Sequence, residues 1–379
     1  MSIPTKKIQM VDLKSQYEKI KSEVDAGIQN VINNTAFING PAVKEFQADL
    51  EKYLNVKHVI PCANGTDALQ IAMMALALKP GDEVITASFT YVATAEVIGL
   101  LGLTPVLVDV DKDTFNINVE AIERAITPNT KAIVPVHLFG QCANMEQIIA
   151  LAKKYDLFVI EDVAQAIGAD YTFSDGKKLK AGTIGTIGCT SFFPSKNLGC
   201  YGDGGAIFTN DDLLAKKLRM IAHHGQSKQY VHDVLGINSR LDTIQAAILK
   251  EKLKHLDEYA AARNKAANYY DKAFANHSKI ITPIRAKNST HVFHQYTIQL
   301  VGVDRTKFRE QLFERGIPAM IYYPIPLHLQ NAYKSDRFKK EDFSITEKLC
   351  ATVLSLPMHT EMDEETLKYI CTNLLELVK

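Results

Sequence analysis

The sequence predicts an α/β protein that has a mainly parallel sheet in a large first domain and a smaller α+β domain after it. Over the first 210 residues, short apolar strands rich in Val, Ile and Leu alternate with helical segments. Continuous apolar strands of this kind are typical of a parallel sheet that is covered on both faces. Beyond about residue 250 the pattern changes, since residues 294–300 alternate polar and apolar as a half-solvated antiparallel strand does. We therefore expect a large domain over residues 1–250 and a small domain over 251–379.

The expected elements of the large domain follow from apolar spacing. The helical spacing predicts helices over 11–32, 42–54, 68–77, 93–101, 119–125, 145–155 and 211–222. The apolar runs predict strands over 58–62, 83–86, 105–108, 132–136, 157–160, 190–193 and 206–209. A long helix over 239–263 should contain the domain boundary. In the small domain we expect, besides the strand over 294–300, helices over 305–315 and 363–377.

Composition excludes several classes of protein. The 379 residues carry 43 Lys plus Arg against 43 Asp plus Glu, and this zero formal charge argues against a nucleic-acid binder. No apolar run approaches the roughly 20 residues that span a bilayer, and the charged N-terminus over residues 1–7 lacks the apolar stretch of a secretory signal. Six cysteines without a CxxC pair are typical of reduced thiols, so a cytoplasmic location is expected.

The most informative stretch is a strand, a lysine and a glycine-rich turn over residues 190–205. Pro194 ends the strand, and Lys196 follows two residues later, before the glycines at 199, 202, 204 and 205. A surface lysine would be the default interpretation. Here, however, strand-like segments on both sides hold Lys196 still, and an amine held still and partly desolvated is well placed to attack a carbonyl.

Two further features lie where strands end. Asp162 follows the apolar strand 157–160, and therefore lies at a carboxyl end of the sheet, with Gln165 three residues further on. Alone, such an aspartate more often caps the next helix. The turn 64–67 joins a strand to a buried helix, and its backbone N–H groups with the Thr66 hydroxyl suit a phosphate, although an Asn or Thr cap needs no ligand.

Other chemistries lack their motifs. The chain has no GxxxxGK[ST] loop, no strand followed by GxGxxG, no HExxH and no GxSxG elbow. The histidine pairs 223–224 and 291–294 lack the further partners of a metal site, so no metal is expected. A phosphate cup, a carboxylate at a strand end and a lysine on a later loop match the phosphate, ring nitrogen and aldehyde of pyridoxal 5′-phosphate (PLP).

Over nearly its whole length the sequence resembles the DegT/DnrJ/StrS family of nucleotide-sugar aminotransferases. The most specific matches are Glu161-Asp162-Val163-Ala164-Gln165, Ser191-Phe192-Phe193-Pro194-Ser195-Lys196 and residues 236–242. The resemblance implies the aspartate aminotransferase-like fold (PLP fold type I), with a seven-stranded sheet in the large, PLP-binding domain. It also implies PLP as cofactor, L-glutamate as amino donor and a homodimer with shared active sites.

The resemblance also implies roles for residues at matching positions. Lys196 would form the Schiff base with PLP and move the proton, and Asp162 would pair with the ring nitrogen. The remaining cofactor contacts would be Gly65, Thr66 and Ser191 at the phosphate, Gln165 at the ring hydroxyl, Phe89 on the ring face, and Asn238 reaching the phosphate from the second subunit. Arg240, Tyr322, Tyr323 and His328 would contact the nucleotide sugar.

The branch that the sequence resembles most aminates C3 of a UDP-linked 3-keto-hexuronate for polysaccharide biosynthesis. In that branch we expect Pro at position 197, Gly at 239 and His at 322, where this chain has Asn197, Ser239 and Tyr322. A rival of the same fold is an aminotransferase for a dTDP- or UDP-linked 4-keto-6-deoxy sugar. A PLP sugar dehydratase is a second rival of the same fold, although this chain has Lys196 at the position where those enzymes have a histidine. A rival of another class is a non-catalytic PLP-fold regulatory protein.

Overall fold

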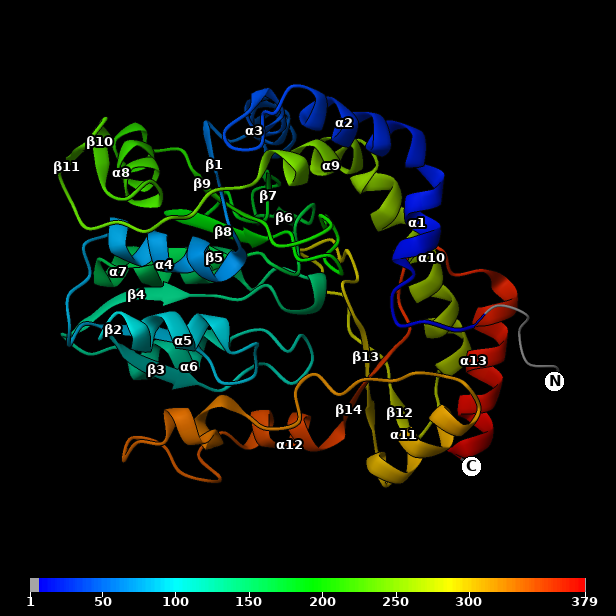
Figure 1. Cartoon of the computed structure of the whole chain (residues 1–379). Coiled ribbons are helices and arrows are strands. Elements are labelled where there is room, and N and C mark those ends of the chain that lie inside the picture. The colour runs from blue at the N-terminus through cyan, green and yellow to red at the C-terminus, as the bar shows by residue number, and fades with distance from the viewer. Residues whose placement is uncertain (1–6, 379) are drawn as a thin grey trace.

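The structure is a computed structural model that describes residues 7–378. Residues 1–6, on which the expectation of no secretory signal partly rests, lie outside the described part of the chain. Within it, no helix is both long and apolar enough to cross a membrane. Figure 1 shows a layered α/β body beside a smaller C-terminal part.

The centre of the large part is a seven-stranded sheet in the order β1-β9-β8-β5-β4-β2-β3. Its strands are β1 (His58–Cys62), β2 (Glu83–Ala87), β3 (Thr104–Val108), β4 (Thr130–Val134), β5 (Phe158–Asp162), β8 (Ile187–Ser191) and β9 (Gly205–Thr209). β9 runs antiparallel to both of its neighbours, and the other pairs are parallel. The expected mainly parallel sheet is therefore confirmed.

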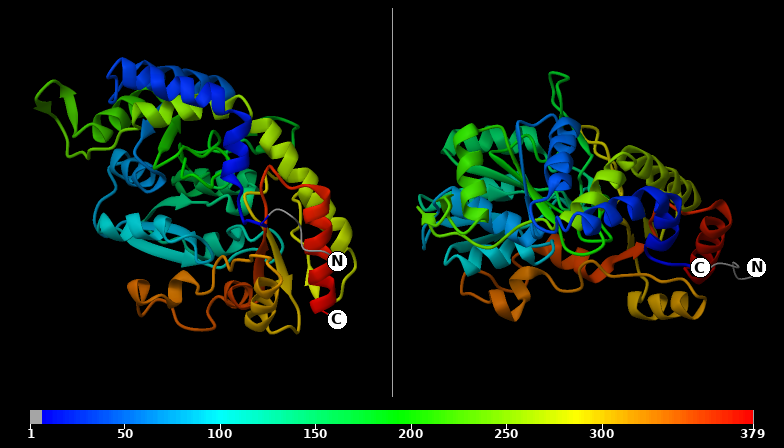
Figure 2. Two further views of the ribbon diagram at one scale, coloured as in Figure 1. Left: turned by 45° about the vertical axis from the view of Figure 1, so that its right-hand side comes forward. Right: turned by 45° about the horizontal axis from the view of Figure 1, so that its top comes forward.

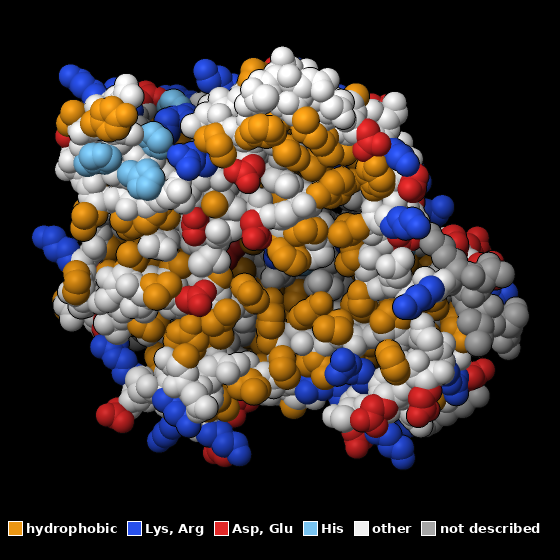
Figure 3. All heavy atoms as spheres, viewed as in Figure 1, with side chains coloured by type: hydrophobic (Ala, Val, Ile, Leu, Met, Phe, Trp, Pro, Cys, Tyr) orange, Lys and Arg blue, Asp and Glu red, His pale blue; other side chains and the backbone are white. Residues whose placement is uncertain are grey.

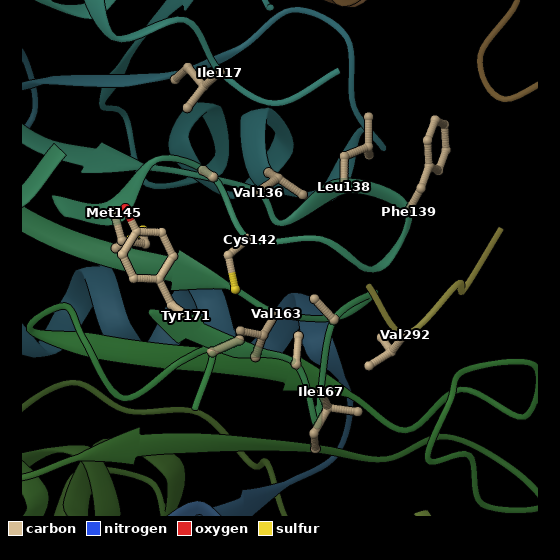
Figure 4. Packing of buried hydrophobic residues seen from close by; sticks show 14 of the residues in the cluster. Ile117, Val136, Leu138, Phe139, Cys142, Met145, Val163, Ile167, Tyr171 and Val292 are labelled. Atoms are coloured by element: carbon tan, nitrogen blue, oxygen red, sulfur yellow. The ribbon is translucent and has the colours of Figure 1, made fainter. Parts of the chain in front are cut away.

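Apolar side chains alternate between the two faces of this sheet, because successive side chains of a strand point in opposite directions. On β2, Val84 belongs to the core beneath α4, α5 and α8, whereas Ile85 belongs to the core of the other face. The helices on the Val84 face are α4 (Gly65–Ala75), α5 (Ala93–Leu100) and α8 (Asp212–Ala222). The core on the Ile85 face includes α3 (Pro41–Leu54), α6 (Val119–Ala125) and α7 (Met145–Tyr155). Figure 4 shows part of the opposite core around Cys142 and Val163.

Two expected long helices are each broken in the structure. The segment 11–32 forms α1 (Leu13–Lys19) and α2 (Lys21–Asn33), which are separated at Ile20, where φ is −122° and ψ is 17°. The segment 239–263 forms α9 (Thr243–Leu253) and the start of α10 (Leu256–Phe274), and His255 between them is also non-helical. Neither break contains Gly or Pro, so apolar spacing alone did not reveal it.

The C-terminal part packs helices on a small antiparallel sheet. Its strands are β12 (Ile280–Ile281), β13 (Tyr296–Leu300) and β14 (Val353–Leu356), and its helices are α11 (Arg305–Glu314), α12 (Ser344–Thr352) and α13 (Glu364–Leu377). The antiparallel strand expected over 294–300 is thus present, whereas α12 and β14 were not expected. Because α10 supplies Leu256 to the large core and Phe274 to the C-terminal core, the boundary at residue 250 stays a prediction.

Two hairpins lie outside these sheets. β6 (Asp170–Thr172) pairs with β7 (Lys178–Lys180), and β10 (Gln226–Lys228) pairs with β11 (Val231–His232). Short 3₁₀ turns occur at Leu138–Gly140, Leu327–Leu329 and Asn331–Tyr333. The β10–β11 hairpin projects from the body beside α8 (Figure 2).

Candidate active site

Lys196 lies in the connection between β8 and β9, as the sequence predicted. The Phe192 N–H donates to the Gly204 carbonyl over 2.7 Å, and the Cys200 N–H donates to the Phe192 carbonyl over 2.8 Å, so the connection is closed at its base. The Lys196 residue is partly buried. Burial lowers the pKa of Lys196 to about 8, and the charge of Asp162 partly opposes this shift. A larger fraction of this amine is therefore neutral near physiological pH than of an exposed lysine.

Asp162 is the last residue of β5, at the carboxyl end of the parallel strands. The Thr94 hydroxyl donates to Oδ2 over 2.9 Å, and the Ala164 N–H donates to Oδ1 over 3.1 Å. The residues that follow form turns rather than a helix, so Asp162 has no helix to cap. Burial raises the pKa of Asp162, while these two donors and Lys196 oppose the shift. The carboxylate thus lies in a place that favours a positively charged partner.

The buried side chains of His137 and Glu161 form a hydrogen bond next to Asp162. The Ala143 N–H donates to Nδ1 of His137 over 3.1 Å, so the proton of the neutral ring is on Nε2, which donates to Glu161 over 2.9 Å. The His137 N–H also donates to the Asp162 carbonyl over 3.0 Å. These contacts fix the end of β5 against the end of β4.

The phosphate cup predicted at the turn 64–67 is the first turn of α4. The Asn64 side chain caps the helix by accepting from the Asp67 N–H over 2.8 Å, and the N–H groups of Gly65 and Thr66 precede the first intrahelical bond. A Cβ on Gly65 would lie 2.7 Å from Cβ of Ser191, so glycine allows the helix to approach the end of β8. The cup therefore combines helix N–H groups with the Ser191 hydroxyl.

These features share one cavity of about 690 Å³. Its lining includes Gly65, Thr66, Asp162, Gln165, Ser191, Lys196, Tyr322 and Tyr323, all of which were predicted. The Tyr323 hydroxyl accepts from Gln165 Nε2 over 3.2 Å. Exposed Tyr91 and Phe193 also line the cavity. Figure 3 shows one face of the molecule, hollowed near its centre with hydrophobic side chains around the hollow.

The structure does not bring four other predicted residues into this lining. Phe89 is buried behind the cavity, where its ring lies 6.1 Å from that of Tyr323 and 6.3 Å from that of Phe139. His328 is also buried, and its ring lies between the hydroxyl of Ser88 at 2.7 Å and the carboxylate of Glu347 at 3.2 Å. Asn238 is exposed, and Arg240 is partly buried outside the lining. The single chain thus supports a packing role for Phe89 and His328.

Sequence reasoning missed other residues of the lining, namely Tyr91, Phe139, Asp203, His294 and Gln295. Asp203 lies within the stretch 190–205 but was given no role there, and His294 was considered only as half of a metal pair. Among the described residues, no group of three or more His, Cys, Asp or Glu side chains is arranged to hold a metal ion.

The residues of the cavity fit PLP. They provide an amine for its aldehyde, a buried carboxylate for its ring nitrogen, and helix N–H groups with the Ser191 hydroxyl for its phosphate. The fold and the site together define a PLP-dependent aminotransferase of fold type I. The chain belongs to the DegT/DnrJ/EryC1/StrS aminotransferase family, whose model matches residues 18–375. Members of this family are PLP-dependent sugar aminotransferases, as the resemblance implied.

Individual relatives cover nearly the whole chain. UDP-2-acetamido-2-deoxy-3-oxo-D-glucuronate aminotransferase of Pseudomonas aeruginosa is 48% identical over 97% of this chain and 99% of its own. UDP-N-acetyl-3-dehydro-α-D-glucosamine 3-aminotransferase of Acidithiobacillus ferrooxidans is 44% identical over 96% of each chain. A crystal structure of a DegT/DnrJ/EryC1/StrS aminotransferase from Brucella abortus is 43% identical, with a TM-score of 0.92 over 97% of this chain and 99% of that one.

Proposed function

We propose that this enzyme transfers the amino group of L-glutamate to C3 of a UDP-linked 3-keto-hexuronate, a step in polysaccharide biosynthesis. The observation that carries the proposal is the pair of relatives described above, since both names specify a UDP-linked sugar oxidised at C3. The cytoplasmic location expected from the cysteines stays a prediction.

The roles of the chain's residues follow from their positions. PLP, when bound, would act as an electron sink and carry the amino group between the two substrates. The N–H groups of Gly65 and Thr66 and the Ser191 hydroxyl would hold its phosphate. Asp162 would keep the ring nitrogen protonated through its negative charge. The Lys196 amine would hold the aldehyde and, once free, take a proton from one carbon and return it to another.

The two relatives differ at C6 of the sugar, where a glucuronate has a carboxylate and a glucosamine has a hydroxyl. Among residues 7–378, the charged side chains in the cavity lining of one chain are Lys196, Asp162 and Asp203, so this part of the chain offers no spare cation there for a sugar carboxylate. Arg240 could grip that carboxylate with two parallel hydrogen bonds if the assembled enzyme brings it to the substrate. We therefore assign the recognition of C6 to Arg240.

In a homodimer, the second subunit would supply the Asn238 side chain, which the cavity of a single chain lacks. Tyr230 and Leu235, in and beside the β10–β11 hairpin, are 83% and 89% exposed, and Phe37 and Ile38 beside α3 are also exposed. Apolar exposure on a projecting hairpin is typical of a surface that binds another chain. Because exposed Asn238 follows this segment, a partner that receives the hairpin would receive Asn238 as well.

A half-reaction tests the substrate. The enzyme is loaded with glutamate until the cofactor is in its amino form, and each keto sugar is then added while the absorbance of the aldehyde form is followed. We expect a fast return with the UDP-3-keto-hexuronate and a slow return with a 4-keto-6-deoxy sugar. The opposite order would overturn the sugar assignment and leave the aminotransferase class intact. Arg240→Lys should slow the uronate more than the 3-keto-glucosamine, whose C6 is neutral.

A further inference from the structure

His328 lies in the loop that brings Tyr322 and Tyr323 to the active-site cavity. This loop joins α11 to α12 (Figure 1), both tyrosines line the large cavity, and His328 follows in the 3₁₀ turn Leu327–Leu329. The imidazole is buried, and His328 is not among the described residues that line the large cavity. It can therefore affect a substrate only through the residues that it holds in place.

Both ring nitrogens of His328 have a hydrogen-bond partner. Nδ1 lies 2.7 Å from the Ser88 hydroxyl, and Nε2 lies 3.2 Å from the carboxylate of Glu347. An ionised carboxylate can only accept, so Nε2 of the neutral ring carries the proton and Nδ1 accepts from the Ser88 O–H. Because Ser88 directly follows β2 and Glu347 lies on α12, the imidazole links the large sheet to α12.

Backbone hydrogen bonds hold the same junction. The Leu327 N–H donates to the Ser88 carbonyl over 3.0 Å, and the Ser88 N–H donates to the carbonyl of Val108, the last residue of β3, over 2.9 Å. Asp109, the next residue, accepts from two N–H groups at the start of α12 over 3.1 and 2.8 Å. The loop and α12 are thus attached to the carboxyl ends of two parallel strands.

The loop contacts the cavity residues beside this junction. The ring of Phe89, which follows Ser88, lies 6.1 Å from that of Tyr323, and the Tyr323 hydroxyl accepts from Gln165 Nε2 over 3.2 Å. The orientation of Gln165 is fixed, because its Oε1 accepts from the Phe139 N–H over 2.8 Å. No described residue accepts from the Tyr323 O–H, so this proton is available to a ligand in the cavity.

Ser88, His328 and Glu347 have the composition of a hydrolase triad, but they cannot carry out that chemistry. Ser88 is fully buried, so a substrate carbonyl has no access to its hydroxyl. The hydroxyl also pairs with Nδ1, whereas the serine of a hydrolase triad pairs with Nε2. The three side chains therefore connect segments of the chain and perform no reaction of their own.

We propose that His328 is a positioning residue for the keto-sugar half-reaction. Through its hydrogen bond with Ser88 it fixes the loop, and thereby the place at which Tyr323 presents its hydroxyl to the sugar. A misplacement of 1 Å can slow a reaction roughly 100-fold, so a firm attachment of the loop matters. The inference rests on the proposed function, because it takes a keto sugar as the acceptor, and it holds whichever carbon of that sugar is aminated.

Two variants of His328 separate its two hydrogen bonds. His328→Asn places an amide near the position of Nδ1 and retains a partner for Ser88, whereas His328→Gln reaches the position of Nε2 and retains only the bond to Glu347. Enzyme with the cofactor in its amino form is mixed with the UDP-linked 3-keto-hexuronate, and the return of the aldehyde form is followed by absorbance. We expect a rate at least about 10-fold below that of the wild type in His328→Gln and within about threefold of it in His328→Asn. Equal rates in the two variants would overturn the proposal.

Ser88→Ala repeats the test without changing the imidazole. It removes the hydroxyl that donates to Nδ1, so it should slow the keto-sugar half-reaction as His328→Gln does. If the His328 variants do not fold, Ser88→Ala decides, and a rate equal to that of the wild type would contradict the proposal.

A double-mutant cycle tests whether His328 acts through Tyr323. Tyr323→Phe already lacks the hydroxyl, so adding His328→Gln should slow the keto-sugar half-reaction by less than about twofold more. Losses that simply multiply are typical of independent residues, and they would rule out an action through Tyr323.

Phe343→Leu is the matched control. The Phe343 ring packs edge-on against the imidazole, with 4.7 Å between the ring centroids, so this variant loosens the same junction and removes no hydrogen bond. It should lower the melting temperature and keep the keto-sugar rate close to that of the wild type. A loss equal to that of His328→Gln would show a merely structural effect and overturn the proposal.

The glutamate half-reaction is the reference for every variant. Glutamate is much smaller than a nucleotide sugar and contacts less of the cavity, so its rate should stay near that of the wild type. A parallel loss of both half-reactions would count against the positioning role. A wild-type enzyme that reacts with glutamate and with no keto sugar would instead overturn the proposed function, and this inference with it.

Discussion

Lys196 and Asp162 show how burial shapes individual residues of this enzyme. Both lie in one cavity, and burial disfavours the charged form of each, so it lowers the pKa of the lysine and raises that of the aspartate. Their opposite charges partly counteract both shifts. The pair therefore provides a nucleophile that is available near neutral pH, together with a carboxylate that gains from a cationic ring.

The pH dependence of cofactor capture should report the state of Lys196. Since only the neutral amine attacks an aldehyde, the rate at which cofactor-free protein binds PLP covalently should rise with pH and level off above about 8, the pKa of the lysine. Asp162→Asn should move that midpoint to lower pH, because the aspartate charge raises the pKa. Stopped-flow absorbance measures the rate, and a midpoint near that of an exposed lysine, about 10.4, would contradict the assignment.

Loss of the carboxylate should impair turnover more than binding. We expect Asp162→Ala to lower kcat at least about 100-fold, the scale of a key electrostatic contact in an active site. Thr94→Val, which removes one hydrogen bond to the same carboxylate and retains the charge, serves as the milder control. Initial rates with glutamate and the keto sugar measure both. Turnover of Asp162→Ala close to that of the wild type would assign the residue a purely structural role.

At the scale of elements, the site lies where β5, β8 and α4 meet. The carboxyl ends of parallel strands gather at one edge of a sheet, so Asp162 and Ser191 come together although 28 residues separate them in the chain. β8 and β9 carry Lys196 in the connection between them, and α4 turns its N-terminus toward Ser191.

Gly65→Ala tests the close approach of α4 to Ser191 at the end of β8. The added Cβ would come within 2.7 Å of Ser191, and the backbone nearby leaves little room to move, so either the helix or the end of β8 has to shift. We expect the affinity for PLP to fall roughly 10-fold or more, since the phosphate loses aligned donors. Fluorescence titration of the cofactor-free protein measures it. Gly99→Ala, on α5 where a Cβ meets nothing within 4 Å, is the control and should bind normally.

The elements could be predicted to different degrees. Apolar runs located six of the seven strands of the large sheet closely, because strands buried on both faces leave a continuous signal. β8 spans Ile187–Ser191, whereas the apolar run predicted 190–193. The break at His255 was missed because the sequence there contains no Gly or Pro to mark it. His294 and Tyr91 could not be assigned to the site, since their position depends on contacts between distant segments. Lys196 and Asp162 were found because the features that identify each of them lie within a short, continuous stretch of sequence.

At the scale of the whole molecule, the single chain is an incomplete enzyme under the dimer proposal. Asn238 lies outside the cavity of its own chain, and the hairpin before it exposes apolar side chains. Each site of a dimer would then contain residues of both subunits.

Subunit mixing checks this arrangement. Lys196→Ala and Asn238→Ala, each inactive alone, are mixed in equal amounts under exchanging conditions, and activity is assayed. Half of the dimers should be mixed, with one intact site each, so about a quarter of the wild-type activity should return. Lys196→Ala mixed with itself should recover nothing. If exchange is verified by mass spectrometry and activity stays absent, the sites are not shared; the test requires Asn238→Ala alone to be severely impaired.

The cavity also links the cofactor to folding thermodynamics. Its walls come from residues between 64 and 323, so no contiguous portion of the unfolded chain can present them together. A ligand that binds only the native state stabilises it by mass action, by about 2.7 kcal/mol when its free concentration is 100 times its dissociation constant. Melting of the enzyme should therefore shift to higher temperature with each increment of PLP, and a chain that has not yet bound its cofactor should be the less stable form.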